Sequence, residues 1–370
     1  MDFLIESEAL HARVRAFAAG RAEPGETFER LALDIARFQA RYVPGFARLV
    51  DRAQSSLDHV EEIPAVPTDA FRVTRVAVHP AEFDEVRFLT SGTTGPPGMH
   101  ALRTTSTYRE LALRSGQAAL TSAWRGRSVV VALAPVPAEP PTSSLGFMLR
   151  TFMEVFDGRA LRVDPDGVRF DASSPARWLA APGGIDLGGL VRAAAVARRR
   201  HEPLLVLATS FALVLLLDAL GDGRIAVPRR TVLMQTGGTK GRTRTVEPEA
   251  LRTAIARAFR LTPAHVVGEY GMTELTSQLY EGTEPGVYLA PPWLRVTPVD
   301  PVTLEPLPEG EVGIAKLVDL GNVDSAVAIV TQDLVRARAG GIELCGRRPG
   351  AAPRGCSLAM EALVGRGKAP

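Results

Sequence analysis

Hydrophobic side chains recur at two different spacings along the chain, and the spacing changes near residue 86. Residues 28–54 carry apolar side chains three and four positions apart, which predicts one or two amphipathic helices. From residue 86 onward, short apolar runs alternate with helical segments: VRFLT, SVVVALAP, PLLVLATS, RTVLMQTGG and HVVGEYG. Short runs rich in β-branched residues between helices indicate an α/β architecture.

Two other stretches mark the borders of this α/β region. The Pro-containing stretch EEIPAVPTDAFR predicts an extended connector. Beyond residue 286 the chain is strand-like and rich in Pro, which predicts a smaller β-rich subdomain. We therefore expect four parts: a helical segment at 1–60, an α/β core at 61–285, a β-rich subdomain at 286–347, and a mobile tail at 348–370 that carries Cys356.

The most apolar run is too short for a membrane span. It extends from Leu204 to Leu217, about fourteen residues, whereas a spanning helix needs about twenty. We expect a buried strand that continues into a core helix. The N-terminus has early acidic residues and no basic region followed by an apolar block, so we expect no secretory signal and a cytoplasmic protein.

Composition narrows the classes of function. Of 370 residues, 46% are hydrophobic, which excludes a disordered or fibrous chain. The net charge of +2 argues against nucleic acid as the main ligand. Any reaction that needs an amine side chain has three candidates, which are Lys240, Lys316 and Lys368.

A loop suited to phosphate follows the apolar run VRFLT. Ser91, Thr93 and Thr94 supply hydroxyl donors, while Gly92 and Gly95 allow positive φ values and close approach of the backbone. Such a loop can turn its backbone N–H groups around an anion. The alternative is a Gly/Ser/Thr turn without a ligand. The loop does not match Walker A, because no Gly-Lys-Ser/Thr follows.

The run HVVGEYG leads into a second polar segment. Tyr270 offers a flat face on which a purine can stack. Thr273 offers a hydroxyl, and Glu274 a carboxylate suited to Mg²⁺, which prefers oxygen ligands and accompanies triphosphates. The alternative is a strand end with one solvated Glu.

Two further segments also stand at strand ends. Gly237 and Gly238 could lie flat against a base with Lys240 beside them, and Asp333 in IVTQDL could accept hydrogen bonds from ribose hydroxyls. Each is weak alone. Open α/β folds bind ligands at the carboxyl ends of their strands, so the shared position of all four segments is the informative feature.

The motifs TSGTTG, GEYGMTE and TQDL followed by CGR resemble, in this order, the core motifs of the adenylate-forming (acyl-AMP ligase) superfamily. GGTKGR, VDPVTLEPLPEGEVG and RGCSLAMEAL look like its acyl-protein synthetase (LuxE-type) branch. The resemblance runs from about residue 60 to the end. It implies a large domain of mixed sheets flanked by helices, with a small β-rich subdomain and without the superfamily's usual C-terminal domain.

The resemblance also implies an activity. ATP and Mg²⁺ would activate a carboxylic acid, for this branch a fatty acid, to an acyl-adenylate with release of pyrophosphate. The acyl group would then move to an enzyme cysteine and on to a partner reductase or a carrier protein. Glu274 would hold Mg²⁺. The residues expected at the nucleotide are Ser91, Gly92, Thr93, Thr94, Gly95, Gly237, Gly238, Tyr270, Gly271, Thr273, Asp333 and Arg347.

The chain departs from the superfamily at the end of the first motif. The usual Lys is absent, and Gly98, Met99 and His100 stand there instead. We expect Lys240 or one of three arginines to supply the missing charge, although Lys240 could be a plain surface residue. The three arginines are Arg242, Arg336 and Arg347. His100 could bind phosphate or order the loop, and a lone His is more often structural.

Cys356 is the candidate nucleophile. It lies in APRGCSL, where the adjacent Arg354 favours the thiolate, and it matches the acylated cysteine of the LuxE-type branch. The alternative is an inert surface cysteine. Cys345 is expected to pack as a small hydrophobe.

Three classes of function remain open on the sequence. The first is an acyl-protein synthetase that loads Cys356, with Lys240 and Glu274 as the other catalytic residues. The second is an adenylate-forming ligase for an aryl or short acid, with delivery to a carrier protein or CoA. The third is a non-catalytic nucleotide-binding homologue. The acid would be bound near the apolar stretches 147–156 and 211–217.

Overall fold

The computed structural model describes residues 2–90, 96–157, 162–163, 169–170, 177–181, 183–237 and 247–351. These residues form two units, each described by itself below. The described part of unit 1 lies within Met1–Ser115, Gly271–Leu279 and Gly286–Ala352. That of unit 2 lies within Gly116–Tyr270 and Tyr280–Pro285.

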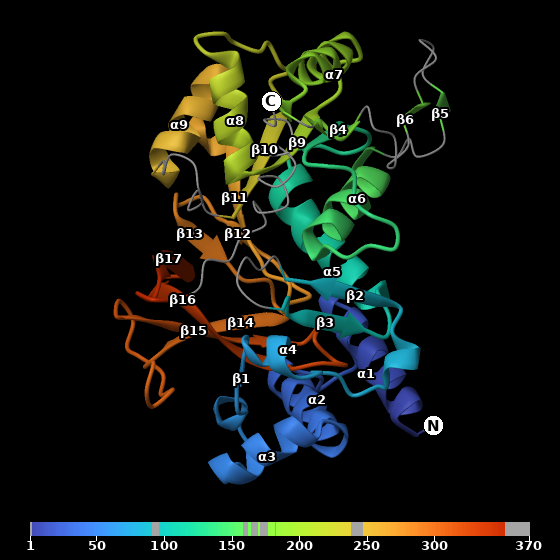
Figure 1. Ribbon diagram of the computed structural model, residues 1–370, viewed down its shortest axis with the longest axis vertical. Helices are drawn as coiled ribbons and strands as arrows, with labels where there is room; N and C mark the ends of the chain where they lie inside the picture. The colour runs from blue at the N-terminus through green and yellow to red at the C-terminus, as the bar shows by residue number, and fades with distance from the viewer. Residues whose placement is uncertain are drawn as a thin grey trace. The chain divides into compact units, whose positions relative to one another are not determined.

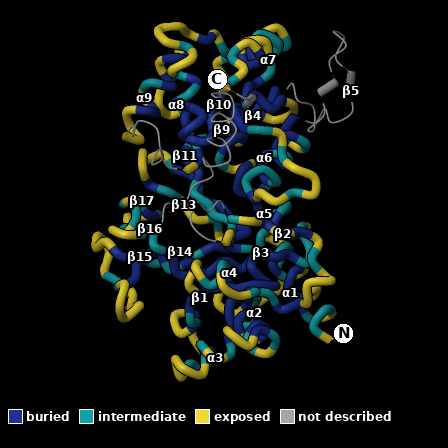
Figure 2. The backbone as a smooth tube through the Cα atoms, viewed as in Figure 1, coloured by how far each residue is buried: buried dark blue, intermediate teal, exposed yellow. Residues whose placement is uncertain are grey.

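Unit 2 is built on a parallel sheet (Figure 1). Its strands, in spatial order, are β4 (Val129–Leu133), β9 (Leu204–Thr209), β10 (Thr231–Thr236) and β11 (Val266–Tyr270). Every residue of β4 and β9 is buried (Figure 2), as expected for strands covered on both faces. The apolar runs that predicted these strands are confirmed.

Helices pack on this sheet through a continuous apolar core. One face carries α7 (Leu187–Arg199), α8 (Ser210–Leu220) and α9 (Pro248–Ala258), and α6 (Ser144–Asp157) packs against β4. The predicted strand running into a core helix is confirmed by β9 and α8. The side chain of Thr209 caps α8 by accepting a hydrogen bond from the backbone N–H of Ala212 at 3.2 Å.

Unit 2 also contains several short elements. They are η3 (Gln117–Thr121), the pair β5 (Arg162–Val163) and β6 (Arg169–Phe170), the pair β7 (Ala180–Ala181) and β8 (Gly184–Ile185), and η5 (Pro263–His265). Strand β12 (Leu279–Glu281) follows the loop after β11.

Unit 1 contains an antiparallel sheet. Its order is β14 (Leu294–Val299), β15 (Val312–Asp319), β16 (Ala328–Arg338), β17 (Gly341–Arg347) and β13 (Val287–Leu289). These strands agree with the strand-like pattern beyond residue 286.

The connector EEIPAVPTDAFR is more ordered than its sequence predicts. It contains η1 (Val60–Glu62), β1 (Val66–Pro67) and the start of α4 (Ala70–Val73). Strand β1 pairs in parallel with β16 at Ile329 and Val330, whereas β17 pairs with β16 only from Asp333 onward. Because β17 pairs with only part of β16, the remaining part of β16 is available to pair with β1 of the connector.

A two-stranded hairpin and four longer helices complete unit 1. Strands β2 (Val86–Leu89) and β3 (Met99–Leu102) are antiparallel, with η2 (Ala81–Phe83) before them and α5 (Ser106–Gly116) after them. The N-terminal helices are α1 (Asp2–Ala18), α2 (Phe28–Tyr42) and α3 (Pro44–Ala53). Helices α2 and α3 confirm the predicted amphipathic segment. Among the described residues, no helix is long and apolar enough to cross a bilayer.

Candidate functional site

The base of the β2–β3 loop is closed by reciprocal hydrogen bonds. The backbone N–H of Thr90 donates to the carbonyl of Gly98 at 2.8 Å, and the N–H of Gly98 donates to Thr90 Oγ1 at 2.7 Å. Arg72 of α4 adds a bond from Nε to the carbonyl of Pro96 at 3.3 Å. The predicted phosphate-binding residues lie between these ends but outside the described residues: Ser91, Gly92, Thr93, Thr94 and Gly95.

The loop after β11 is held by the buried carboxylate of Asp319. Asp319 accepts hydrogen bonds from Ser277 Oγ at 2.6 Å and from the backbone N–H groups of Thr276 and Gly321 at 3.0 and 2.9 Å. Burial raises the pKa of Asp319, and these hydrogen bonds act against that increase. The sequence reading missed Asp319, because nothing in its own segment marks it.

Thr273 and Glu274, predicted to contact phosphate and Mg²⁺, are anchored through their backbone carbonyls. His100 Nδ1 lies 2.7 Å from the carbonyl oxygen of Thr273, and Asn322 Nδ2 donates to that of Glu274 at 2.9 Å. A carbonyl only accepts, so Nδ1 carries the imidazole proton and Nε2 accepts from Ser325 Oγ at 2.8 Å. Two side chains from different segments therefore fix two consecutive residues.

The surroundings of His100 suit an anchor rather than a charged ligand. The ring is fully buried and meets Phe71 edge-on, with centroids 5.5 Å apart. Burial lowers the pKa of His100 to about 4, so the imidazole is neutral at pH 7. The geometry therefore favours loop ordering over phosphate binding for this residue.

The donor set around Glu274 fits a metal ion that arrives with a nucleotide. The side chain of Glu274 is buried, and the described residues contain no group of three or more His, Cys, Asp or Glu side chains that could hold a metal. Mg²⁺ bound with a triphosphate usually takes only one or two protein carboxylates, its other ligands being phosphates and water. A single Glu is compatible with that arrangement.

Two residues predicted at the nucleotide meet in the unit 1 sheet. Asp333 of β16 lies opposite Arg347 of β17, and Arg347 Nε is 3.1 Å from Asp333 Oδ1. The pair lies at the point along β16 where pairing with β1 has ended and pairing with β17 begins. Both side chains are partly exposed, and a carboxylate accepts several hydrogen bonds, so the pair is compatible with ribose hydroxyls as further donors.

Some of the remaining candidate cations and cysteines lie within the described residues, and the others lie outside them. Arg336 pairs with Glu343 at 3.0 Å. Cys345 is half-buried near the same Glu343, and burial raises the pKa of its thiol, which disfavours the nucleophilic thiolate. Lys316 donates to a backbone carbonyl in η1. Outside the described residues lie Gly238, Lys240, Arg242 and Cys356.

Unit 2 gathers polar side chains at the carboxyl ends of three parallel strands. Thr236 Oγ1, at the end of β10, donates to the carboxylate of Glu269 on β11. Ser210 Oγ, just beyond β9, donates to the carbonyl of Gly237 at 2.5 Å and accepts from Gln235 Nε2 at 3.0 Å. Gly237 has a φ of 71°, a left-handed conformation that favours glycine.

Glu269 is a second residue that the sequence reading missed. It stands beside the half-buried Tyr270 in the motif GEYGMTE, and its side chain is buried. Burial raises the pKa of Glu269 to about 7, while the hydrogen bond from Thr236 acts in the opposite direction. The available signal was an acidic residue inside an otherwise buried strand pattern.

Comparison with proteins of known sequence gives a partial match. No protein-family model matches the chain. The long-chain-fatty-acid–luciferin-component ligase of Vibrio harveyi is 29% identical over 143 residues, which cover 35% of this chain and 37% of that protein. The matched region thus spans little more than a third of this curated relative. The similarity confirms the resemblance to acyl-protein synthetases that the motifs indicate.

Comparison with solved structures concerns the fold. A 2-hydroxyisobutyryl-CoA ligase with 2-HIB-AMP and CoA, in the thioesterification state, has a TM-score of 0.61 at 14% identity, covering 86% of this chain and 67% of that chain. Its postadenylation state with 2-HIB-AMP also gives 0.61, at 13% identity, covering 89% and 68%. The chain shares its fold with these ligase structures. The predicted α/β class, with mixed sheets flanked by helices, is confirmed.

Proposed function

We propose that this protein activates a carboxylic acid with ATP, forming an acyl-adenylate and releasing pyrophosphate. The observation that carries the proposal is the loop after β11, where buried hydrogen bonds hold Thr273 and Glu274 in a chain with a ligase fold. The ion pair of Asp333 and Arg347 supports it, because it joins two residues that the motifs predict at the nucleotide.

Each residue has a definite task in this reaction. Asp333 would accept hydrogen bonds from the ribose hydroxyls, and Tyr270 would stack on adenine. Thr273 would donate to phosphate, and the carboxylate of Glu274 would hold Mg²⁺. A carboxylate oxygen of the acid would attack the α-phosphorus of ATP, and the bond to the pyrophosphate oxygen would break. Glu274 would hold Mg²⁺, which with nearby cationic side chains would supply positive charge for the leaving pyrophosphate.

The finer proposal is that the acid is a long-chain fatty acid and that Cys356 receives the acyl group. It is supported by the similarity to the Vibrio harveyi ligase over part of the chain. The Cys356 thiolate would attack the acyl carbon, a carbon–sulfur bond would form, and AMP would leave. A reductase or a carrier protein would then accept the acyl group.

Four residues are candidates for the positive charge that replaces the missing superfamily Lys, and two of them have carboxylate partners. Arg336 and Arg347 already form ion pairs with Glu343 and Asp333. We propose Lys240, with Arg242 as the alternative, as the cation near the leaving pyrophosphate.

One observation favours a second candidate, a small polar acid passed to CoA or a carrier protein. Ser210, Thr236 and Glu269 place hydroxyl and carboxyl groups at the strand ends of unit 2, where open α/β folds bind ligands. These groups hydrogen-bond one another or the backbone, and a polar substituent on the acid could share in these bonds, which an unbranched apolar chain cannot do.

The test is a screen of pyrophosphate exchange into ATP over long-chain, hydroxylated and aryl acids. Exchange that depends on one acid class supports the proposal and selects between the two candidates, and an Asp333→Asn variant should lose most of it. Absence of exchange with every acid would leave the non-catalytic alternative.

Transfer to a thiol needs a separate readout. Intact mass after incubation with ATP and the acid should show one acyl adduct that hydroxylamine removes. Cys356→Ser should abolish the adduct and keep the exchange, whereas Cys345→Ser, the matched control, should keep both. An adduct that survives Cys356→Ser would remove Cys356 from the reaction.

A further inference from the structure

The loop at 320–327, between β15 and β16, is buried along its whole length. Most connecting segments run over the protein surface, because a buried loop must find partners for all its backbone polar groups. This loop finds them on two sides, in the N-terminal helices and in the segment that carries Thr273 and Glu274.

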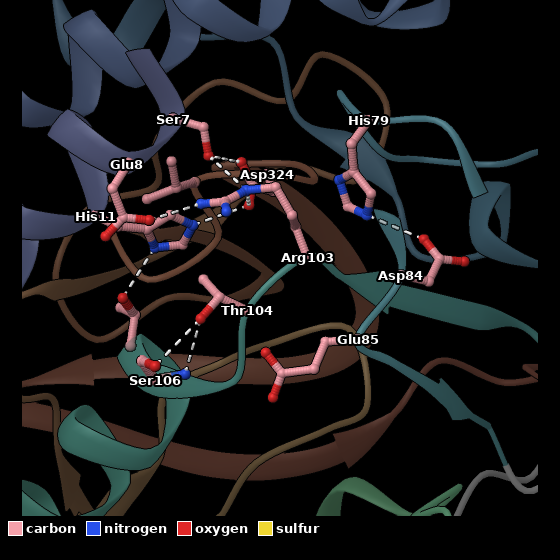
Figure 3. A network of polar contacts seen from close by, with 12 residues as sticks. Ser7, Glu8, His11, His79, Asp84, Glu85, Arg103, Thr104, Ser106 and Asp324 are labelled. Atoms are coloured by element: carbon pink, nitrogen blue, oxygen red, sulfur yellow. Dashed lines mark hydrogen bonds and ion pairs between the residues drawn. The ribbon is translucent and has the colours of Figure 1, made fainter. Parts of the chain in front are cut away.

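On the helix side, Asp324 is the centre of a polar network (Figure 3). Its carboxylate accepts from Ser7 Oγ at 2.5 Å and His11 Nε2 at 2.9 Å, both from α1. Arg103 Nε lies 3.2 Å from the same carboxylate and its Nη2 donates to Glu8 at 3.1 Å. Helix α1 is therefore tied to the loop by two side chains and through Arg103.

Helix α2 binds the same loop through one amide side chain. Gln39 Nε2 donates to the carbonyls of Asn322 and Val323 at 2.7 and 2.9 Å, and its Oε1 accepts from the N–H of Val327 at 2.9 Å. Gln39 is fully buried, so these bonds replace backbone partners that water supplies to an ordinary loop.

On the other side, the loop reaches the two predicted ligand-binding residues. Asn322 donates to the carbonyl of Glu274 at 2.9 Å, and Ser325 supports His100, which donates to the carbonyl of Thr273. The contacts thus run without a break from α1, through Asp324 and the loop, to the backbone of residues 273 and 274.

We infer that His100 and the 320–327 loop are positioning elements for Mg²⁺ and nucleotide binding, and that α1 contributes to this binding through Asp324. The inference rests on the proposed function and adds residues that touch neither nucleotide nor metal. Apolar side chains of similar volume could fill these positions at lower desolvation cost, whereas hydrogen bonds to two consecutive carbonyls select one backbone arrangement.

Two substitutions at His100 separate positioning from packing. His100→Asn keeps an N–H donor at the place of Nδ1, so it retains the bond to Thr273. His100→Gln places its amide nearer to Nε2, so it keeps a partner for Ser325 and loses the bond to Thr273. Both variants are uncharged and polar, and each serves as the control for the other.

The readouts are calorimetric binding of Mg·ATP to the full chain without acid, and hydrogen exchange of the backbone amides in residues 272–278. We expect His100→Gln to weaken Mg·ATP binding about tenfold, in the range measured for partners that orient metal ligands, and to speed exchange in this segment. His100→Asn should stay close to the wild-type protein in both measurements.

The contribution of α1 has its own pair of variants. Asp324→Asn weakens the ion pairs with His11 and Arg103, and we expect weaker Mg·ATP binding and faster exchange in residues 272–278. Asp34→Asn removes an ion pair with Arg13, at 2.7 Å, that also joins α1 and α2 but does not touch the loop. Asp34→Asn should change neither Mg·ATP binding nor the hydrogen exchange of residues 272–278.

The outcomes are distinguishable. A wild-type chain that binds no Mg·ATP contradicts the proposed function, and with it the inference. A wild-type chain that binds Mg·ATP, with Asn and Gln variants at position 100 of equal affinity and equal exchange, contradicts positioning by His100 alone. Should either variant fail to fold, Asn322→Ser, which shortens the donor to Glu274, gives the same comparison.

Discussion

Units 1 and 2 each bury a carboxyl group, that of Asp324 in the 320–327 loop and that of Glu269 in strand β11, but the two groups have different hydrogen-bond partners. Asp324 in unit 1 meets a hydroxyl, an imidazole and a guanidinium, those of Ser7, His11 and Arg103. Glu269 in unit 2 accepts a hydrogen bond from the hydroxyl of Thr236. Burial alone would raise both pKa values, yet the pKa of Asp324 is lowered and that of Glu269 is raised to about 7.

Asp319 shows which kind of partner makes the difference. It accepts hydrogen bonds from Ser277, Thr276 and Gly321, all neutral donors, and its pKa is still raised. Neutral donors do not offset the desolvation of these buried carboxylates, whereas the hydrogen bonds and charges of His11 and Arg103 do for Asp324. We infer that unit 1 keeps Asp324 ionised as part of its architecture, while Glu269 in unit 2 is half ionised near pH 7 and neutral only below it.

The largest effect is expected from Asp324→Ala. Removal of the carboxylate leaves the buried His11 without its acceptor and takes from the partly buried Arg103 one of its two carboxylate partners, which should lower the free energy of unfolding by about 3–5 kcal/mol. Urea denaturation at pH 7 measures it. The control is Asp34→Ala, whose partly exposed ion pair with Arg13 should be worth at most about 1 kcal/mol. Equal losses in the two variants would contradict the comparison.

Glu269→Gln should increase the free energy of unfolding at high pH, whereas Asp324→Ala should decrease the free energy of unfolding. The pKa of Glu269 is about 7 in the folded chain against an ordinary value of 4.5, so the unfolded chain ionises first and the wild-type protein loses stability as pH rises from 4.5 to 7. The variant should therefore be more stable than wild type at pH 8, by up to about 3 kcal/mol, and equal to it near pH 4. Thermal unfolding across pH tests this, and a variant that is less stable at pH 8 would show that Glu269 is ionised and paired.

The lowered pKa of His100 predicts a loss of stability at acidic pH. Its pKa is about 4 in the folded chain against an ordinary value of 6.5, so the unfolded chain takes up the proton first and the wild-type protein loses stability as pH falls from 6.5 to 4. We expect a loss of up to about 3 kcal/mol over this interval that His100→Asn lacks. Parallel curves for the two proteins would exclude a neutral, buried His100.

The smallest effect is expected from Thr236→Val. It removes the hydroxyl that donates to Glu269, at a cost of about 1 kcal/mol, and should move the pH dependence attributed to Glu269 to higher values. Denaturation curves at pH 5 and pH 8 measure both changes. An unchanged midpoint would mean that Thr236 does not influence the carboxyl group.

Local pattern was sufficient for much of the fold. Strands β4, β9, β10 and β11 follow from continuous apolar runs, and helix α2 follows from its spacing of apolar positions. Helix α1 was expected only as part of a helical segment at 1–60 and without bounds of its own, because its buried face includes Ser7 and His11 beside Leu10 and Val14, which interrupts the apolar stripe. Those two polar residues can be buried because Ser7 hydrogen-bonds Asp324 and His11 hydrogen-bonds both Asp324 and Thr107.

The candidate site divides in the same way. Thr273, Glu274, Asp333 and Arg347 could be named from motifs. Thr273 and Glu274 do follow a strand, β11, as polar residues at the ligand-binding edge of an α/β fold should. The strand end predicted at Asp333 is wrong, because β16 continues to Arg338 and pairs with β17 beyond Asp333. Their anchors could not be named. His100, Asn322 and Asp319 lie far from residues 273–277 in the sequence, and nothing near them shows what they bind.

The sequence by itself determined the α/β class, the strands of the parallel sheet and the segments that hold the candidate chemistry, because hydrophobic period and strand-end residues act over a few neighbouring positions. Only the tertiary structure decided which buried carboxyl groups stay charged and which loop is fixed. His11 and Asp324 are 313 positions apart, and the charge of a buried group depends on partners that folding brings within about 3 Å, at any distance along the chain.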